Sequence, residues 1–169
     1  NTDPLTTAID TAVALGASAV SLSWGGAEDN TILAADAHLN HPGVAITASS
    51  GDSGYGAQFP AASQYVTAVG GTTLDLGAGN TYGGETAWSS GGSGCSSSIA
   101  KTNWQTDSGC SRRTIADVAA DADPATGAAV YDSVPYNGTT DWYQVGGTSL
   151  SAPLIGAVYA LAGNATSVT

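Results

Sequence analysis

Positively charged residues are scarce in this sequence. Only Lys101, Arg112 and Arg113 are basic, against 14 acidic residues, and the formal net charge is −11. So few cations exclude a nucleic-acid-binding face, because affinity for nucleic acid depends on lysine and arginine contacts to phosphates. An acidic, lysine-poor surface suits acidic surroundings, where protonation of carboxylates relieves their repulsion. Acidity that serves solubility alone is the alternative interpretation.

Long apolar runs are also missing. No stretch of about 18 consecutive apolar residues is present, so the sequence predicts no membrane span. Charged residues make up only 10 % of the chain and hydrophobic residues 42 %. The surface must therefore be built mainly from Ser, Thr, Asn, Gln and Gly. Length and apolar content predict one globular domain over residues 1–169.

Cysteine is limited to Cys95 and Cys110, which flank a Ser/Gly-rich stretch. Without further Cys or His nearby, the pair does not suit a metal site. A disulfide between them would close a loop of about 15 residues and contribute about 3 kcal/mol. It would imply an oxidising, extracellular compartment; two buried free thiols are the alternative.

The first half of the chain alternates helical and strand patterns. Apolar spacing predicts a helix that begins at Pro4 and stops at Gly16, and a second helix over 31–39. Short apolar runs predict buried strands at 17–24 and 44–49, and the series continues at 65–74. This alternation is typical of βαβ units, so we expect an α/β domain with a mostly parallel sheet.

The second half is less regular. Residues 77–114 are rich in Gly, Ser and Thr and predict a long loop region, pinned by the disulfide. Strands at 128–132 and 141–147 are expected to pair around a turn at Asn137-Gly138. A helix beginning at Thr148 closes the domain. Because the chain opens on a helix and ends just after one, we expect both ends to be cuts through a larger domain.

Three polar loops are predicted to meet at one edge of the sheet. They are 23–26 (SWGG), 49–56 (SSGDSGYG) and 146–149 (GGTS). In open α/β sheets, ligands bind at the carboxyl ends of the strands, where these loops lie. The sequence therefore predicts a functional site at this edge.

Ser149 is the candidate nucleophile of that site. It lies in the first turn of its helix, where free N–H groups and the helix dipole favour a developing negative charge. Pro153 cannot donate a hydrogen bond to the carbonyl of Ser149, and such a break in a helix is typical of functional sites. A simple helix cap with a structural proline is the alternative interpretation.

Asp52 is the second candidate, in a glycine-flanked loop that can form an anion-binding nest; an ordinary turn is the alternative. His38 and His41 precede the strand that Asp52 follows. They should thus lie about 20 Å away, at the other edge of the sheet, and are poor candidates for the base. Asp117, Asp121 and Asp123 lack the glycine and distal glutamate of an EF-hand, so we interpret them as structural carboxylates rather than calcium ligands.

Five sequence blocks together resemble the sedolisins, the serine-carboxyl peptidases, which are acid endopeptidases with a subtilisin-like fold. The Gly-Thr-Ser-x-x-x-Pro pattern alone is compatible with an ordinary subtilisin. Asp52 distinguishes the two, because subtilisins carry asparagine in that loop. The blocks are SLSWGGAE (21–28), ASSGDSGY (48–55), FPAASQYVTAVGGTTL (59–74), DVAADADPATGAAVYD (117–132) and GGTSLSAP (146–153).

The resemblance implies a subtilisin-like three-layer fold and a role for individual residues. Ser149 matches the nucleophile, and Asp52 matches the side chain that lines the oxyanion hole. Ser23, Trp24 and Gly25 match the segment whose backbone pairs with an extended polypeptide substrate. It also implies a secreted enzyme, with a propeptide or remaining chain segments as possible partners.

Two parts of the family pattern have no match here. The family's base is a glutamate, helped by an aspartate four residues later, on a helix upstream of this sequence. Glu28, Glu85 and Asp10 do not occupy that motif. The family's calcium site belongs to a segment beyond Thr169, so the resemblance implies Ca²⁺ for the complete domain and no cofactor or metal ligand within this chain.

The chemistry of these residues favours activity at acidic pH. A histidine with a pKa of about 6.5 is protonated near pH 4, whereas a glutamate of about 4.3 still accepts a proton. Asp52 can donate to an oxyanion only when it is protonated, and one such donor contributes about 3–4 kcal/mol. The leading hypothesis is an acid endopeptidase whose base lies outside this sequence. An inactive, extracellular binding or structural domain and a neutral, histidine-dependent hydrolase are the alternatives.

Overall fold

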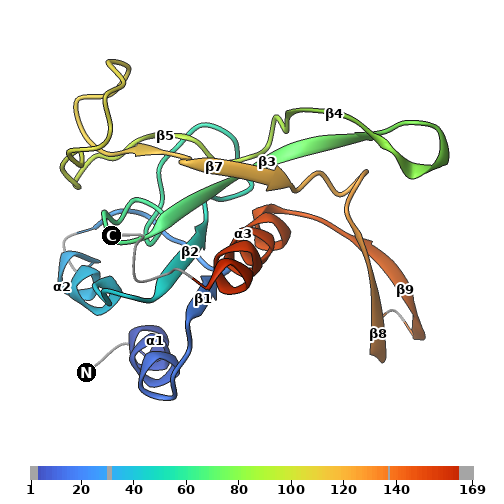
Figure 1. Cartoon of the computed structure of the whole chain (residues 1–169), viewed down its shortest axis with the longest axis horizontal. Helices are drawn as coiled ribbons and strands as arrows, with labels where there is room; N and C mark the ends of the chain where they lie inside the picture. Colours follow the sequence, from blue (N-terminus) through green and yellow to red (C-terminus); the bar gives the residue numbers. More distant parts are fainter. Residues whose placement is uncertain (1–3, 30–31, 137, 164–169) are drawn as a thin grey trace.

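The computed structural model describes residues 4–29, 32–136 and 138–163. The chain alternates helices and strands in its first half, as predicted (Figure 1). The helices are α1 (Pro4–Ala14), α2 (Ile32–Asp36) and α3 (Thr148–Ala162), with 3-10 turns η1 (Ala37–Leu39) and η2 (Ala78–Asn80). The strands are β1 (Ala19–Leu22), β2 (Ala45–Ser49), β3 (Thr67–Leu76), β4 (Tyr82–Ala87), β5 (Gly94–Cys95), β6 (Thr114–Ile115), β7 (Val118–Asp121), β8 (Ala128–Tyr136) and β9 (Thr139–Val145).

The main sheet is mostly parallel. Strand β2 lies between β1 and β3 and pairs with both in parallel, so Ala48 is opposite Leu22 on one side and Ala68 on the other. Strand β7 also pairs with β3 in parallel, and β4 pairs with it antiparallel. The predicted α/β class with a mostly parallel sheet is confirmed.

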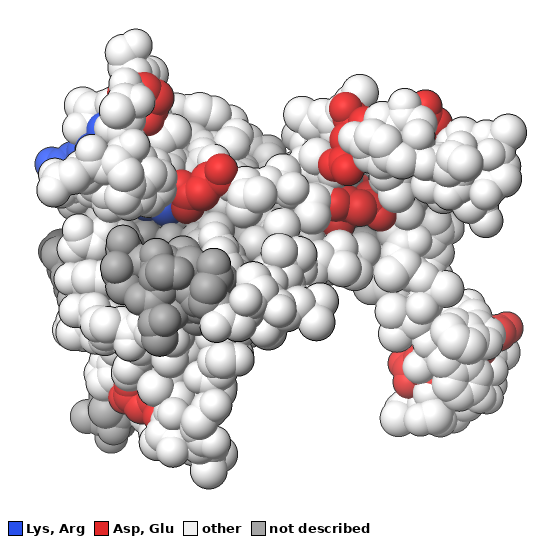
Figure 2. Space-filling view, viewed as in Figure 1, with Lys and Arg blue, Asp and Glu red and all other residues white. Residues whose placement is uncertain are grey.

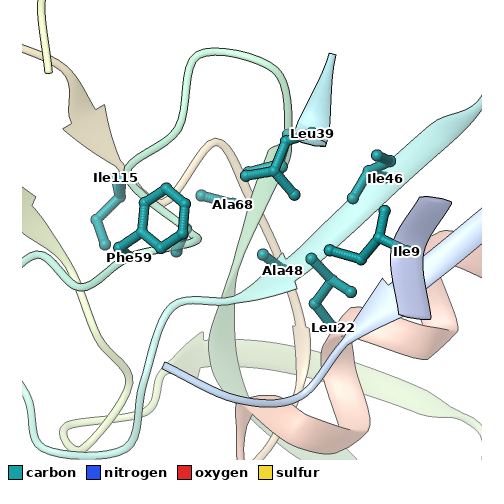
Figure 3. Packing of buried hydrophobic residues seen from close by; sticks show 10 residues of the cluster. Ile9, Leu22, Leu39, Ile46, Ala48, Phe59, Ala68 and Ile115 are labelled. Atoms are coloured by element: carbon teal, nitrogen blue, oxygen red, sulfur yellow. The ribbon is translucent and has the colours of Figure 1, made fainter. Parts of the chain in front are cut away.

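One face of this sheet packs against a hydrophobic core. Strand β2 is buried along its whole length, and successive side chains point to opposite faces. Ile46 and Ala48 lie in one cluster with Ile9 of α1 and Leu39 of η1 (Figure 3). The apolar periodicity of α1 therefore buries its inner stripe against the sheet.

The opposite face of the sheet holds α3 through hydroxyl groups. Thr47 Oγ1 donates to the carbonyl of Ala152 at 3.0 Å, and Ser49 Oγ donates to the carbonyl of Thr148 at 2.9 Å. A Cβ on Gly156 would lie 3.2 Å from Thr47 Oγ1, so glycine permits the close approach of the helix. With α1 and α3 on opposite faces, the domain has three layers.

Strands form in two regions where the sequence predicted none. Strands β4 and β5 lie inside the Gly/Ser/Thr-rich 77–114 region, and β7 lies inside the acidic 117–124 stretch. Strands β4 and β7 are stabilised by pairing with β3, and β5 by pairing with β6, which are tertiary contacts that local sequence does not reveal.

The β8–β9 hairpin forms as predicted and projects from the body of the molecule (Figure 1). Asn137 of the predicted turn lies outside the described residues. Aromatic pairs cover the hairpin: Tyr131 and Trp142 are 5.5 Å apart, and Tyr136 and Tyr143 are 5.9 Å apart, between ring centroids. These contacts between the strands stabilise a ribbon whose side chains are largely exposed.

The cysteines form the disulfide Cys95–Cys110, with an S–S distance of 2.02 Å, so the free-thiol alternative is wrong.

None of the described helices is long and apolar enough to cross a bilayer. Figure 2 shows acidic side chains in separate patches on one face, with basic side chains confined to one corner.

Arg113 is the largest fully buried side chain of the described residues. Its guanidinium pairs with the carboxylate of Asp117 at 2.5 and 2.6 Å and donates to the carbonyls of Ser63, Val66 and Thr114. Asp117 in turn accepts from the N–H of Ala68 at 2.7 Å. The network ties the start of β7 to the start of β3.

Replacement of Arg113 should therefore be costly. We expect Arg113→Leu to lower the free energy of unfolding by about 3–5 kcal/mol, because it removes a fully buried charge and leaves the carboxylate of Asp117, whose side chain is 12 % exposed, without its counter-charge. Exposed Arg112, which donates to the carbonyl of Ser98, supplies the control, and Arg112→Leu should change stability by less than about 1 kcal/mol. Urea unfolding measures both; equal losses would contradict the prediction.

Candidate active site

The structure brings the three predicted loops together at the carboxyl ends of β1 and β2. The N–H of Gly51 donates to Thr148 Oγ1 at 3.1 Å, which joins the loop after β2 to the start of α3. The hydroxyl of Ser23 donates to the carbonyl of Ser149 at 3.4 Å, which joins the loop after β1 to the same turn. The topological prediction of one shared edge is thus met by direct contacts.

Asp52 is anchored on the residue that precedes Ser149. Its Oδ1 accepts two hydrogen bonds from Thr148, from the backbone N–H at 2.7 Å and from the hydroxyl at 2.8 Å. The carboxyl group of Asp52 therefore lies at the first turn of α3. Thr148 was not among the site residues predicted from the sequence. Its position directly before Ser149 is the signal that could have identified it.

Gly147 makes room for this contact. Its φ of 93° is in the left-handed region that favours glycine, and a Cβ there would lie only 2.8 Å from Asp52 Oδ2. Its N–H donates to the carbonyl of Ala122 at 2.5 Å. Backbone conformation and close approach thus both require glycine at this position.

Ser149 presents its side chain to solvent. The residue is exposed, whereas its neighbour Thr148 is only 1 % exposed. Pro153 lies inside α3 and has no N–H for the carbonyl of Ser149, and this carbonyl is the acceptor of the Ser23 hydroxyl. The interruption predicted from the sequence therefore frees a carbonyl that fastens the SWGG loop.

The segment with Trp24 and Gly25 is held from the side by Gln58 and Phe59. The Trp24 and Phe59 rings are 6.4 Å apart, and a Cβ on Gly25 would lie 2.9 Å from Gln58 Oε1. A Cβ on Gly51 would lie 3.0 Å from the same atom. Gln58 therefore fills the space between two of the loops, and no sequence motif singled it out.

The other carboxylates considered above are engaged elsewhere. Glu28 accepts hydrogen bonds from Ser96 and Ser97, and Glu85 is an exposed residue of β4. Within the described ranges, no hydrogen bond joins Ser149 to a carboxylate.

The two histidines share one carboxylate. His38 Nδ1 is 2.7 Å from Asp10 Oδ2, and His41 Nε2 is 3.2 Å from Asp10 Oδ1. The hydrogen bond of His38 is the main reason why the pKa of Asp10 lies below its ordinary value of 3.8. His41 precedes β2, whereas Asp52 follows it, so this cluster belongs to the opposite edge of the sheet.

The aspartates of the 117–124 stretch bind protein donors. Asp121 accepts from Thr126 Oγ1 at 2.8 Å, and Asp123 accepts from Thr73 Oγ1 at 2.7 Å. Asp117 pairs with Arg113. In the described part of the chain, no three His, Cys, Asp or Glu residues are grouped so that they could hold a metal ion.

Three comparisons place this arrangement among known proteins. No family model matches the chain. Kumamolisin of Bacillus sp. (strain MN-32) is 38 % identical over 174 residues, and sedolisin of Pseudomonas sp. (strain 101) is 34 % identical over 173 residues. These alignments cover 85 % and 83 % of this chain but only 30 % and 28 % of the two relatives. The chain thus spans about a third of their length.

A solved structure of Pseudomonas sedolisin, a serine-carboxyl proteinase complexed with two molecules of pseudo-iodotyrostatin, is also similar. It superposes with a TM-score of 0.83 at 30 % identity, covering 96 % of this chain and 53 % of that chain. The self-cleaved protease domain of PatA shares the fold, with a TM-score of 0.58 at 19 % identity.

The crowding at Gly147 generates a stability prediction. We expect Gly147→Ala to be about 1–3 kcal/mol more destabilising than Gly16→Ala, because the new methyl group meets Asp52 Oδ2. Gly16 is the matched control: its φ is 90°, and nothing lies within 4 Å of its Cβ position. Chemical unfolding compares the two variants. Equal losses would mean that backbone strain alone makes glycine necessary at position 147.

The lowered pKa of Asp10 predicts a pH-dependent contribution to stability. A carboxylate whose pKa is lower in the folded state stabilises the fold above its ordinary value and loses this effect as the pH falls through the lowered one. Asp10→Asn should therefore lower the melting temperature at about pH 5, and the difference should disappear towards about pH 2. Asp75→Asn, at an exposed site, is the control. A difference that persists unchanged at about pH 2 would contradict this origin.

Proposed function

Over the region that aligns with kumamolisin and sedolisin, this chain belongs to the sedolisin family of serine-carboxyl peptidases, with their subtilisin-like fold, and we propose that it forms the central part of a secreted acid endopeptidase. Ser149 is the proposed nucleophile and Asp52 the proposed oxyanion-hole donor. The observation that carries the proposal is the pair of hydrogen bonds that fixes Asp52 on Thr148, the residue before Ser149.

The proposed reaction follows the chemistry of acyl transfer. The Ser149 hydroxyl attacks the carbonyl carbon of the scissile peptide and gives its proton to a carboxylate base. The oxyanion of the tetrahedral intermediate accepts a hydrogen bond from protonated Asp52. The C–N bond then breaks, the amine leaves with the proton, and water hydrolyses the acyl-enzyme by the same steps.

The identity of the oxyanion donor sets the working pH. An ionised Asp52 would repel the oxyanion, whereas the neutral acid donates to it, so activity requires acid. A carboxylate base remains able to accept a proton under these conditions, and a histidine does not. We propose that the base and the residues that bind a Ca²⁺ ion belong to sequence outside this chain. No step of the reaction described here depends on the ion.

The SWGG loop is the proposed substrate-binding edge. Backbone groups of Ser23, Trp24 and Gly25 would pair with an extended polypeptide, in the manner of an added β-strand. The anchoring of Trp24 on Phe59 and of Ser23 on α3 supports this role, because a fixed edge gives the substrate one register. The disulfide supports secretion. A propeptide or remaining segments of the polypeptide are proposed partners.

The decisive test is peptide hydrolysis at about pH 4 by the protein as its source produces it. Ser149→Ala should lower kcat by several orders of magnitude, and Asp52→Ala should lower it by about 10²–10³-fold. Arg112→Leu, far from the proposed chemistry, is the matched control and should retain the native rate.

Other outcomes would favour the alternatives. An undiminished rate in Ser149→Ala would reject the mechanism. Absence of acid peptidolysis, together with no labelling of Ser149 by a peptide aldehyde, would favour an inactive binding domain. The lack of a carboxylate partner for Ser149 within the described residues is the observation that keeps this alternative open. A rate that rises from about pH 4 to about pH 8 would favour a histidine-dependent hydrolase.

A further inference from the structure

We propose that Thr148 is a positioning residue that decides which oxygen of Asp52 carries the acidic proton. The inference rests on the proposed function, because it concerns the oxyanion donor of that reaction. It goes beyond that function in assigning the proton to Oδ2 and in naming the group that places it there.

The direction of the Thr148 hydroxyl is determined by its neighbours. The N–H of Gly51 donates to Thr148 Oγ1 at 3.1 Å, so this oxygen already serves as an acceptor. A hydroxyl has a single hydrogen, and Asp52 Oδ1 lies 2.8 Å away. A carboxylate oxygen without a proton can only accept, so Thr148 donates to Asp52.

Two donors on Oδ1 leave one oxygen for the proton. Oδ1 of Asp52 accepts from both the N–H and the hydroxyl of Thr148. A proton on Oδ1 would lie close to these two donor hydrogens and be repelled by them. We therefore assign the proton of the neutral acid to Oδ2. The described residues make no hydrogen bond to Oδ2.

The surroundings of Oδ2 fit a donor aimed at a substrate. This atom lies 2.8 Å from the position that a Cβ of Gly147 would occupy, beside the N-terminus of α3. Gly147 therefore places no side chain against this oxygen. The O–H of Asp52 is thus presented next to the turn that carries exposed Ser149.

Thr148 is itself held rigidly. Its side chain belongs to the fully buried residues, and its carbonyl accepts hydrogen bonds from Ser49 Oγ at 2.9 Å and from Ser151 Oγ at 3.1 Å. Ser49 is the last residue of β2. These bonds hold the backbone of Thr148 on the sheet, whereas its N–H and hydroxyl hold Asp52.

Loss of the Thr148 hydroxyl should have two separable effects. With one donor fewer on Oδ1, the proton of Asp52 can occupy either oxygen, so fewer molecules present the donor correctly and the maximal rate falls. A hydrogen bond stabilises an ionised carboxylate more than a neutral acid. Its loss should therefore keep Asp52 protonated to a higher pH and move the alkaline limb of the rate profile upwards.

The test compares Thr148→Val, which keeps the branched shape, with Thr148→Ser, which keeps the hydroxyl. We expect Thr148→Val to lower kcat by about 10- to 100-fold with little change in KM, and to shift the alkaline limb upwards, because the ionised carboxylate loses a donor. Thr148→Ser should keep the native limb. An unshifted limb in Thr148→Val would overturn the proposal, because a merely structural role lowers the rate without moving it.

Ser49→Ala is the matched control for packing. It removes a hydrogen bond to the carbonyl of Thr148 but leaves both donors to Asp52, so it should lower stability and leave the alkaline limb in place. If Thr148→Val does not fold, Thr148→Ala removes the same hydroxyl with less steric demand. A shifted limb in Ser49→Ala would also overturn the proposal.

A second readout does not need activity. The Asp52 carboxyl carbon, followed by ¹³C NMR between about pH 3 and about pH 7, should lose its proton at a higher pH in Thr148→Val than in the native protein and Thr148→Ser. If this shift is present but Ser149→Ala remains active, the proposed function fails and the Thr148–Asp52 coupling stands. If Ser149→Ala is inactive and the shift is absent, the proposed function stands and this inference fails.

Discussion

The candidate site depends on how the first turn of α3 is seated on the sheet. The helix contains no charged residue, and its inner side is made of small residues, so backbone carbonyls come close to β2. Hydroxyls from Thr47, Ser49 and Ser23 donate to three of these carbonyls. An apolar interface is non-directional and would allow the helix to shift along its axis. Hydrogen bonds are directional, so these three contacts fix the position of α3 along its axis. Thr148 extends the same set of contacts to Asp52.

The elements that support the site were predictable because their signals are local. The apolar runs of β1, β2 and β3 and the periodicity of α1 predicted strands and helices, and the topology of parallel sheets then predicted that residues 23, 52 and 149 share one edge. The strands β4 and β7 were not predictable, because polar and acidic sequences form them only against β3. Thr148 and Gln58 were missed for a similar reason: their importance lies in atoms from distant loops, and no motif records such contacts.

Fixed positive charge is scarce, and Arg113 and Lys101 each pair with a carboxylate. Arg113 is buried against Asp117, and Lys101 pairs with Asp107 at 2.9 Å. At the other edge of the sheet the histidines bind Asp10. Asp52, the carboxylate described beside the turn of Ser149, has hydroxyl and amide partners rather than a cation. Protonation of a carboxylate that has no cationic partner breaks no ion pair.

The glycine pair between β9 and α3 has a mechanical consequence. Paired glycines between two elements are commonly regarded as hinges, but Gly146 and Gly147 are crowded. A Cβ on Gly146 would lie 2.5 Å from the backbone nitrogen of Pro124, and one on Gly147 would reach Asp52. The connection between the β8–β9 hairpin and α3 therefore has no room for a side chain at either position, and a larger residue there would displace Pro124 or Asp52.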